Sequence, residues 1–322
     1  MEKLLEQALS AYGLVNTRVE FLRHNENMTY RLTDTLSGKK YVLRIHKSSD
    51  SFSLDMFGAK QHSFECIKSE MEILYAIHTR TDLLVQTPIK NRLGEFVTML
   101  RGDIPATLLT WVDGEILEKV HKNRQTYYNI GEMTGRLHYF FKNWEYSNDM
   151  KRYYYDQQLL FSIHENMKQA AKCDIIKKEH EMIIQKALVQ ILHRMKELDF
   201  VEGSKGLTHA DLSQSNMLYS RGKIVPIDFC LCGFSYYYMD LGSLFNYFFG
   251  KEERRLILQG YVDIAGIEIQ SKYIEAFMAL QIILYISSHY EKSGHLKWFQ
   301  DGVERWCRET FVPLIENIPF AL

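Results

Sequence analysis

Three polar residues suited to phosphoryl transfer lie close together in the second half of the chain: Asp211, Asn216 and Asp228. Asp211 and Asn216 fit the order His-x-Asp-x4-Asn, and Asp228 follows twelve residues after the asparagine. In kinase catalytic loops the first aspartate accepts the proton of the attacked hydroxyl, while the asparagine and the later aspartate hold magnesium. The pattern predicts Asp211 as the catalytic residue and Asn216 and Asp228 as Mg²⁺ ligands.

The surroundings of these residues favour the catalytic interpretation over an ordinary turn. A lone asparagine after a lone aspartate is typical of a satisfied turn, so the short motif decides little by itself. Here the motif lies between Leu207 and Leu218, and a turn at residues 221–223 leads to the apolar run Ile-Val-Pro-Ile before Asp228. Two short hydrophobic strands joined by a polar turn are therefore expected to carry the three polar residues.

On these motifs the chain resembles the aminoglycoside phosphotransferase and choline kinase-like superfamily, small-molecule kinases that are distant relatives of protein kinases. The resemblance covers about residues 20–245. It implies an α+β, bilobal protein kinase-like fold, with a small antiparallel sheet and one helix in the N-lobe and a larger, mainly helical C-lobe. We expect a nucleotide-binding lobe at residues 1–110 and, at residues 111–322, a helical lobe with the catalytic loop and acceptor pocket.

The chain departs from the family pattern within the catalytic loop itself. Where the family commonly shows H-G-D-L-H-x-G-N, this sequence has Ala210, Ser213, Gln214 and Ser215, and Cys230 occupies the glycine position of D-F-G. A loop histidine that often lies near the phosphates is therefore missing.

A charged pair is predicted in the first lobe. Residues 18–23, 28–33 and 40–46 are expected to form a β-meander, and alternation places Arg44 on one face of the third strand. Residues 59–79 show helical periodicity that puts Glu70 beside the apolar stripe, while Glu65 and Glu72 fall opposite. The resemblance implies that Arg44 holds the nucleotide phosphates and that Glu70 pairs with it.

Strands are also expected at residues 95–100 and 106–112, followed by a turn. The resemblance identifies this second strand end as the hinge, where the backbone of Thr110 to Val112 meets the base and Leu109 lines the pocket behind it. An ordinary strand end before a turn is the alternative. The loop at residues 24–27 holds no glycine and the chain has no P-loop, so the usual nucleotide-binding motifs are absent. ATP and GTP are both open as the donor.

The helical half carries further expectations. Gly131 and Gly135 lie one turn apart in a helix at residues 125–141, where another backbone can approach closely, and helices are expected at residues 153–171 and 175–198. The aromatic run at residues 234–249 is more typical of core than of a cage for a cationic ligand. By resemblance, His138 is structural and Asp240 braces the catalytic loop.

Composition limits the partners and the compartment. The chain of 322 residues has a formal net charge of −1, so no global field favours nucleic acid or an anionic membrane. The most apolar stretch, at residues 276–286, is interrupted by Gln281 and is too short for a bilayer. Five cysteines without a C-x-x-C pair indicate a reducing cytoplasm, with Cys230 and Cys232 as buried thiols rather than metal ligands. The oligomeric state is left open.

The expected reaction is transfer of the γ-phosphoryl group of ATP or GTP, with Mg²⁺, to a hydroxyl of a small molecule such as an aminoglycoside, an amino alcohol or a sugar. One alternative is a Ser/Thr protein kinase of the same superfamily. Another is a nucleotide-binding pseudokinase or scaffold, whose sign would be loss of Asp211, Asn216 or Asp228; all three are present. A role in antibiotic resistance and a role in metabolism both remain open.

Overall fold

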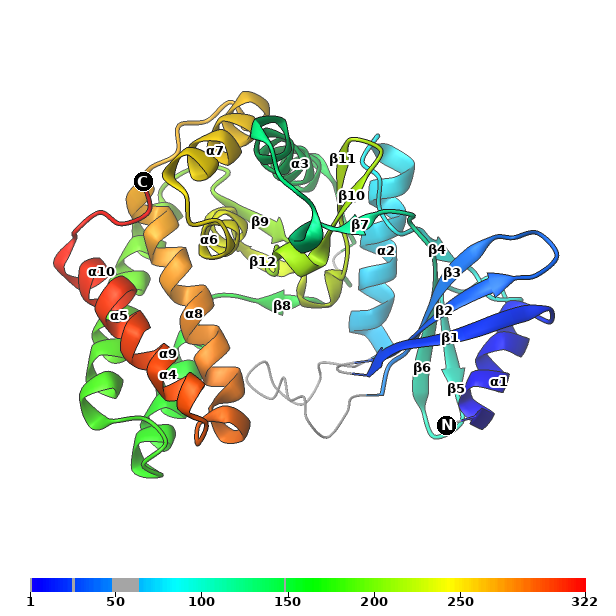
Figure 1. Cartoon of the computed structure of the whole chain (residues 1–322), viewed down its shortest axis with the longest axis horizontal. Helices are drawn as coiled ribbons and strands as arrows, with labels where there is room; N and C mark the ends of the chain where they lie inside the picture. The colour runs from blue at the N-terminus through cyan, green and yellow to red at the C-terminus, as the bar shows by residue number, and fades with distance from the viewer. Residues whose placement is uncertain (1, 25–26, 48–63, 148) are drawn as a thin grey trace. The chain divides into compact units, whose positions relative to one another are not determined.

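The structure is a computed structural model that describes residues 2–24, 27–47, 64–147 and 149–322 (Figure 1). The chain divides into two compact units. One is formed by Met1–Gly114 with Tyr146–Arg152, and the other by Glu115–Glu145 with Tyr153–Leu322. The predicted α+β class is confirmed, because an antiparallel sheet dominates the first unit and helices dominate the second.

The first unit is built on one antiparallel sheet in the order β1-β2-β3-β6-β4, with β5 also pairing with β6. Its strands are β1 (Thr17–His24), β2 (Met28–Asp34), β3 (Lys40–Ile45), β4 (Pro88–Ile89), β5 (Val97–Leu100) and β6 (Ile104–Thr110). Its helices are α1 (Glu2–Tyr12) and α2 (Phe64–Arg80), so the described residues of this unit form two helices where the resemblance implied one. The predicted meander is confirmed by β1 to β3, whereas the predicted start of the helix at residue 59 lies outside the described residues.

Alternation along β3 divides the first unit into an apolar side and a charged side. Leu43 and Ile45 are buried in one cluster with Leu4 and Ala8 of α1. Arg44 points to the opposite face, as successive side chains of a strand must. One face of β3 therefore packs in the hydrophobic core, and the other face carries the charged side chain of Arg44.

The second unit is mainly helical, with two three-stranded sheets in the orders β11-β10-β7 and β8-β12-β9. Its helices are α3 (Arg124–Asn143), α4 (Gln157–Lys172), α5 (Lys178–Asp199), α6 (Tyr238–Tyr247), α7 (Lys251–Ala265), α8 (Ser271–Ser293), α9 (Lys297–Trp306), the π-helix η5 (Cys307–Phe311) and α10 (Val312–Glu316). Its strands are β7 (Glu115–Ile116), β8 (Tyr153–Tyr154), β9 (Lys205–Thr208), β10 (Met217–Ser220), β11 (Lys223–Pro226) and β12 (Gly233–Tyr236). Three short 3-10 helices, η2 (Leu117–Lys119), η3 (Gln214–Asn216) and η4 (Phe229–Leu231), connect them.

Glycines bring α3 and α7 into backbone contact, as predicted for Gly131 and Gly135. A Cβ at Gly131 would lie 1.8 Å from the carbonyl oxygen of Ile257, and one at Gly135 would lie 3.0 Å from that of Tyr261. Gly260 of α7 makes the reciprocal approach, because its Cβ would lie 2.1 Å from the carbonyl oxygen of Tyr128. Figure 1 shows the two helices side by side.

Two predictions about the helical unit need correction: where the helix expected from residue 153 begins, and the burial of Cys230. The helix expected from residue 153 begins at Gln157, because Asp156 caps it and the preceding tyrosines of β8 pair in parallel with β12. The aromatic run is divided between β12 and α6, and most of its tyrosines are buried, which fits the core interpretation. Cys232 is fully buried, but Cys230 is partly exposed and so differs from the predicted pair of buried thiols.

None of the five cysteines forms a disulfide, and all five belong to described parts of the chain. Across the same described ranges, no helix combines the length and the apolarity needed to cross a membrane.

Candidate active site

The loop after β9 holds Asp211 and Asn216 in direct contact. The amide nitrogen Nδ2 of Asn216 donates to the carboxylate Oδ2 of Asp211 at 2.7 Å and to the backbone carbonyl of Asp211 at 3.1 Å. Asn216 is buried, whereas Asp211 is partly exposed. The predicted catalytic carboxylate is therefore fixed by the predicted metal-binding amide and still reaches the surface of its unit.

A tight hairpin brings Asp228 to the same place. Ser220 pairs with Lys223 across Arg221 and Gly222, which both have positive φ, as a two-residue type I′ turn requires. The register then sets Met217 opposite Pro226, and the N–H of Ile227 donates to the carbonyl of Asn216 at 2.9 Å. Asp228 is the next residue, so the twelve-residue spacing is the length of this hairpin.

The oxygen atoms of Asn216 and Asp228 fit a hard cation. Because Asn216 directs its Nδ2 at Asp211, its Oδ1 faces elsewhere, and this oxygen accepts no hydrogen bond within the described parts of the chain. Asp228 is 7% exposed and has a left-handed backbone with φ 66°, a strained conformation of the kind found at functional sites. An amide oxygen and a carboxylate are ligands that Mg²⁺ prefers, so these two residues are the candidates to hold it.

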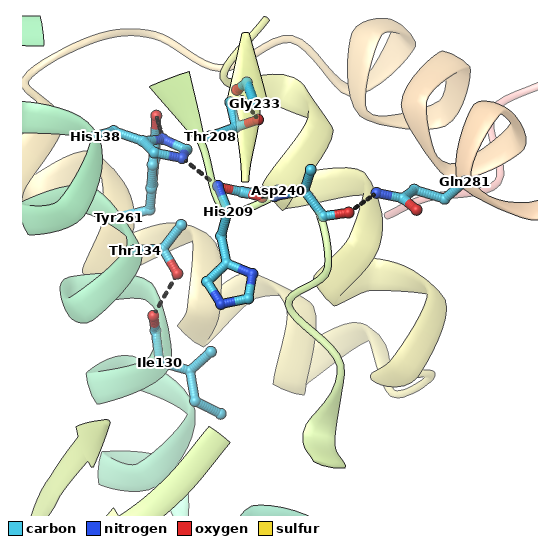
Figure 2. A network of polar contacts seen from close by, with 10 residues as sticks. Ile130, Thr134, His138, Thr208, His209, Gly233, Asp240, Tyr261 and Gln281 are labelled. Atoms are coloured by element: carbon cyan, nitrogen blue, oxygen red, sulfur yellow. Dashed lines mark hydrogen bonds and ion pairs between the residues drawn. The ribbon is translucent and has the colours of Figure 1, made fainter. Parts of the chain in front are cut away.

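Asp240 holds the backbone of the catalytic loop, as the resemblance implied. Its Oδ2 accepts the N–H of His209 at 2.9 Å, and its Oδ1 accepts the N–H of Ala210 at 2.7 Å. From α8, Gln281 donates its Nε2 to the carbonyl of Ala210 at 2.9 Å (Figure 2). Ala210 has φ 63°, a left-handed conformation that favours glycine, so these bonds offset the strain of the alanine that replaces the family's glycine.

His138 of α3 supports Asp240 from behind, and both side chains are buried. Its Nε2 donates to the Asp240 carboxylate at 2.8 Å, and its Nδ1 lies 2.9 Å from the hydroxyl of Tyr261. Burial alone would raise the pKa of Asp240, but the hydrogen bond and charge of His138 together hold this pKa below its ordinary value. Asp240 therefore stays ionised while it anchors the loop, and the predicted structural role of His138 is supported.

His209 links the catalytic loop to the segment that carries Asp228. Its Nε2 donates to the carbonyl of Ile227 at 3.1 Å, and its ring lies 4.5 Å from that of Phe229. The side chain is fully buried, and burial lowers the pKa of His209. His209 thus connects the residues before Asp211 with the residues on either side of Asp228.

In the first unit, Arg44 and Glu70 form the expected ion pair. The Nη1 of Arg44 lies 2.9 Å from the Oε1 of Glu70, and both side chains are buried. Gln86 lies 3.5 Å from the other terminal nitrogen of Arg44. Glu65 is exposed and Glu72 is half-buried, so the helical periodicity selected the correct glutamate. The role of Arg44 toward phosphate remains a prediction.

The predicted hinge residues lie at the end of β6 and directly after it. Leu109 is fully buried and pairs with Val42, while the N–H of Thr110 donates to the carbonyl of Thr87 at 2.9 Å. The strand ends at Thr110 rather than at Val112. Val112 is buried, and its N–H donates no hydrogen bond within the described parts of the chain. Among the backbone N–H groups predicted to contact the base, that of Val112 is thus the candidate donor to a nucleotide base, because those of Thr110 and Trp111 already donate to other carbonyls.

Gln281 is a positioning residue that sequence reasoning did not assign. It is a polar residue within the apolar run of α8, and its side-chain amide donates to the carbonyl of Ala210. A polar residue inside an otherwise apolar buried helix was the available signal, because such a residue requires a hydrogen-bond partner.

Similarity to known proteins agrees with this geometry. Residues 18–274, more than half of the chain, match the phosphotransferase enzyme family. Amicoumacin kinase of Bacillus subtilis (strain 168) is 24% identical over 248 residues, which cover 76% of this chain and 67% of that protein.

Two solved structures share the fold. An amicoumacin kinase in complex with AMP-PNP, Ca²⁺ and Ami has a TM-score of 0.78 at 19% identity, covering 99% of this chain and 94% of that one. A microcompartment-associated aminopropanol kinase has a TM-score of 0.76 at 19% identity, with full coverage of both chains. The predicted kinase-like fold is thereby confirmed. Together with the family match over residues 18–274, these findings show that the chain belongs to the phosphotransferase enzyme family.

Proposed function

We propose that this phosphotransferase moves the γ-phosphoryl group of ATP or GTP to a hydroxyl group of a small, amine-bearing molecule. The observation that carries the proposal is the 2.7 Å hydrogen bond between Asn216 and Asp211, which makes the catalytic carboxylate and the metal-binding amide one rigid unit. The names of two similar proteins support a small-molecule acceptor, since one acts on amicoumacin and the other on the amino alcohol aminopropanol.

Asp211 is the residue that orients and deprotonates the acceptor hydroxyl. Its Oδ2 is held by Asn216, and a partly exposed carboxylate in a fixed position can accept a proton from a hydroxyl at hydrogen-bond distance. Asn216 and Asp228 would hold Mg²⁺, which when bound neutralises charge on the phosphate oxygens. Catalysis would then rest on positioning and electrostatics, which is where most of the rate enhancement in phosphoryl transfer arises.

The nucleotide is assigned to residues of the first unit. Glu70 holds one side of the Arg44 guanidinium, whose planar fork can engage a phosphate with other N–H groups. The N–H of Val112 would donate to the edge of the base, with Leu109 behind it and Thr110 closing the strand. A cytoplasmic location is part of the proposal and is supported by the absence of disulfides among the five cysteines; recovery of the native protein outside the cytoplasm would contradict it.

The test combines nucleotide binding with turnover. Mg-ATP at 100 times its dissociation constant should stabilise the parent by about 2.7 kcal/mol, read as a thermal shift, and Mg-GTP serves as the comparison. Asp228→Asn should lose the magnesium-dependent part of that shift, and Arg44→Ala should weaken nucleotide binding while the fold stays intact. Asp211→Asn should bind Mg-ATP like the parent but release ADP at least about 100-fold more slowly with an acceptor.

Asp301→Asn, an exposed carboxylate on α9, is the matched control and should behave like the parent in both measurements. A full metal-dependent shift in Asp228→Asn, or loss of nucleotide affinity in Asp211→Asn, would show that the two carboxylates have other roles.

A further inference from the structure

One face of α8 leads away from the catalytic residue. Gln281 contacts the carbonyl of Ala210, which directly precedes Asp211. Tyr285 lies four residues beyond Gln281 and His289 four residues further, so the three side chains share one face of the helix. Each step advances about 6 Å along the axis. The face therefore forms a row that starts at the catalytic loop.

The two aromatic residues of this row are stacked on each other. The ring centroids of Tyr285 and His289 lie 4.2 Å apart with an interplanar angle of 24°. Trp306 meets Tyr285 edge-on at 5.8 Å and directly precedes the π-helix η5, a type of element that is frequent at functional sites. Tyr285 is nevertheless 37% exposed. Its ring is thus held in place by neighbours while part of it still faces solvent.

Tyr247 lies beside the catalytic loop. It is the last residue of α6, and Gln214 of the catalytic loop donates to its carbonyl at 2.7 Å. Burial of the phenol raises the pKa of Tyr247 to about 12, and the charges of Asp211 and Tyr285 add to this effect. Tyr247 remains 44% exposed. Tyr247 is therefore next to the catalytic loop through Gln214, and Tyr285 lies one step further along α8 than the residue that contacts Ala210.

Carboxylates lie near Tyr247, whereas the cations Lys292 and Arg305 lie near His289 and Trp306. The carboxylate of Glu118, on η2, is the further group that raises the pKa of Tyr247, and Glu118 is exposed. Burial lowers the pKa of His289, so its imidazole adds no positive charge near neutral pH. At Tyr247, an aromatic ring with carboxylates beside it favours a cationic ligand over an anionic one.

We propose that Tyr247, Tyr285 and His289 form the surface that determines acceptor specificity, and that the acceptor is an amine with a ring system that stacks on Tyr285. The inference rests on the proposed function, because it takes Asp211 as the residue that meets the hydroxyl. Tyr285 lies about 6 Å along α8 beyond Gln281, the residue that contacts the catalytic loop, so we expect an amino alcohol of two or three carbons at Asp211 to leave Tyr285 without a contact. The stacked rings of Tyr285 and His289 would therefore contact only a larger acceptor.

The experiment measures ADP release by the full chain with Mg-ATP and four probes: 1-amino-2-propanol, choline, spectinomycin and amicoumacin A. We expect at least one of the two ring-bearing amines to exceed both amino alcohols in kcat/KM by tenfold or more. Tyr285→Ala should raise the KM for that ring-bearing amine at least tenfold and leave kcat and the KM for ATP close to the parent values. Tyr285→Phe, which keeps the stacking ring, should restore the KM to within twofold.

Tyr139→Ala, which removes a tyrosine that is 63% exposed on α3, is the matched control and should leave every constant unchanged. The inference is overturned if Tyr285→Ala leaves the KM for ring-bearing amines unchanged, if the amino alcohols are the better substrates, or if neither ring-bearing amine stimulates ADP release although Mg-ATP stabilises the protein. Absence of any stabilisation by Mg-ATP would instead overturn the proposed function, and this inference with it.

Discussion

At the scale of single residues, His209 makes the stability of the catalytic loop depend on pH. Burial is the main cause that lowers its pKa from the ordinary value of 6.5, and the charges of Asp240 and Asp228 only partly oppose it. The unfolded chain therefore binds a proton at this residue at a higher pH than the folded protein does. Its contribution to stability is complete above pH 6.5 and is lost as the pH falls below that value.

We expect the free energy of unfolding to fall between pH 7.5 and pH 5.5, by at most about 1.4 kcal/mol per pH unit from this one group. Urea unfolding at pH 7.5, 6.5 and 5.5 measures it. His180 and His289, whose pKa values burial also lowers, add to the slope, so the specific check is that His209→Gln flattens it. His295→Gln, at an exposed histidine, is the control. Equal slopes in the parent and His209→Gln would refute the assignment.

At the scale of elements, the contact between α3 and α7 depends on having no side chain at Gly131. Replacing a helical glycine with alanine normally stabilises a helix by about 1 kcal/mol. Here the new Cβ would lie 1.8 Å from the carbonyl oxygen of Ile257, so the two helices must separate. We expect Gly131→Ala to lower the free energy of unfolding by on the order of 3 kcal/mol, because a rigid backbone cannot move aside cheaply.

Gly135→Ala should cost less, since its nearest contacts are a side-chain carbon at 2.9 Å and a carbonyl oxygen at 3.0 Å. Chemical denaturation of both variants shows which one loses more free energy of unfolding. Tyr139→Ala, on the exposed side of the same helix, is the reference. A Gly131→Ala protein more stable than the parent would mean that the helices pack less closely than described.

At the scale of the whole molecule, one buried arginine joins segments of the second unit that lie far apart in the sequence. Arg254 of α7 donates to the carbonyls of Phe245, Phe248 and Ala321 at 2.7, 2.7 and 2.8 Å. Glu275 of α8 accepts the N–H of Ala321 at 3.1 Å from the other side. These bonds fix residues 320–321 against α6, α7 and α8.

Arg254→Lys should therefore destabilise the protein by on the order of 3 kcal/mol, because one ammonium group cannot satisfy several separated carbonyls and each buried unsatisfied group costs about 1–3 kcal/mol. The neighbouring Arg255 is exposed, so Arg255→Lys is the matched control for thermal and chemical unfolding. If both lysine variants unfold like the parent, the carbonyls have other partners and the arginine does not hold the segment.

The sequence by itself determined the parts of the site whose geometry is local. Asp211, Asn216 and Asp228 come together because a two-residue turn fixes the register of one hairpin. The spacing of twelve residues from Asn216 to Asp228 corresponds to the length of that hairpin. Glu70 could be selected because helical periodicity leaves one glutamate beside the apolar stripe. The longer strands of the first unit were predictable because alternation shows which face is buried, whereas the two-residue strand β4 was not predicted.

Only the tertiary structure decided the features that depend on distant segments. Ala210 keeps a conformation that its sequence disfavours because Asp240 and Gln281 hold its backbone. Residues 153–154, where a helix was expected to begin, instead form β8 and pair with β12. Local periodicity cannot show this, because the partner strand is distant in the sequence. Gln281 and Tyr285 lie about 70 residues or more from Asp211 in the chain, and which face of α8 meets the catalytic loop is set by helix packing. Packing is a property of all the neighbouring elements together, so no single stretch of sequence contains it.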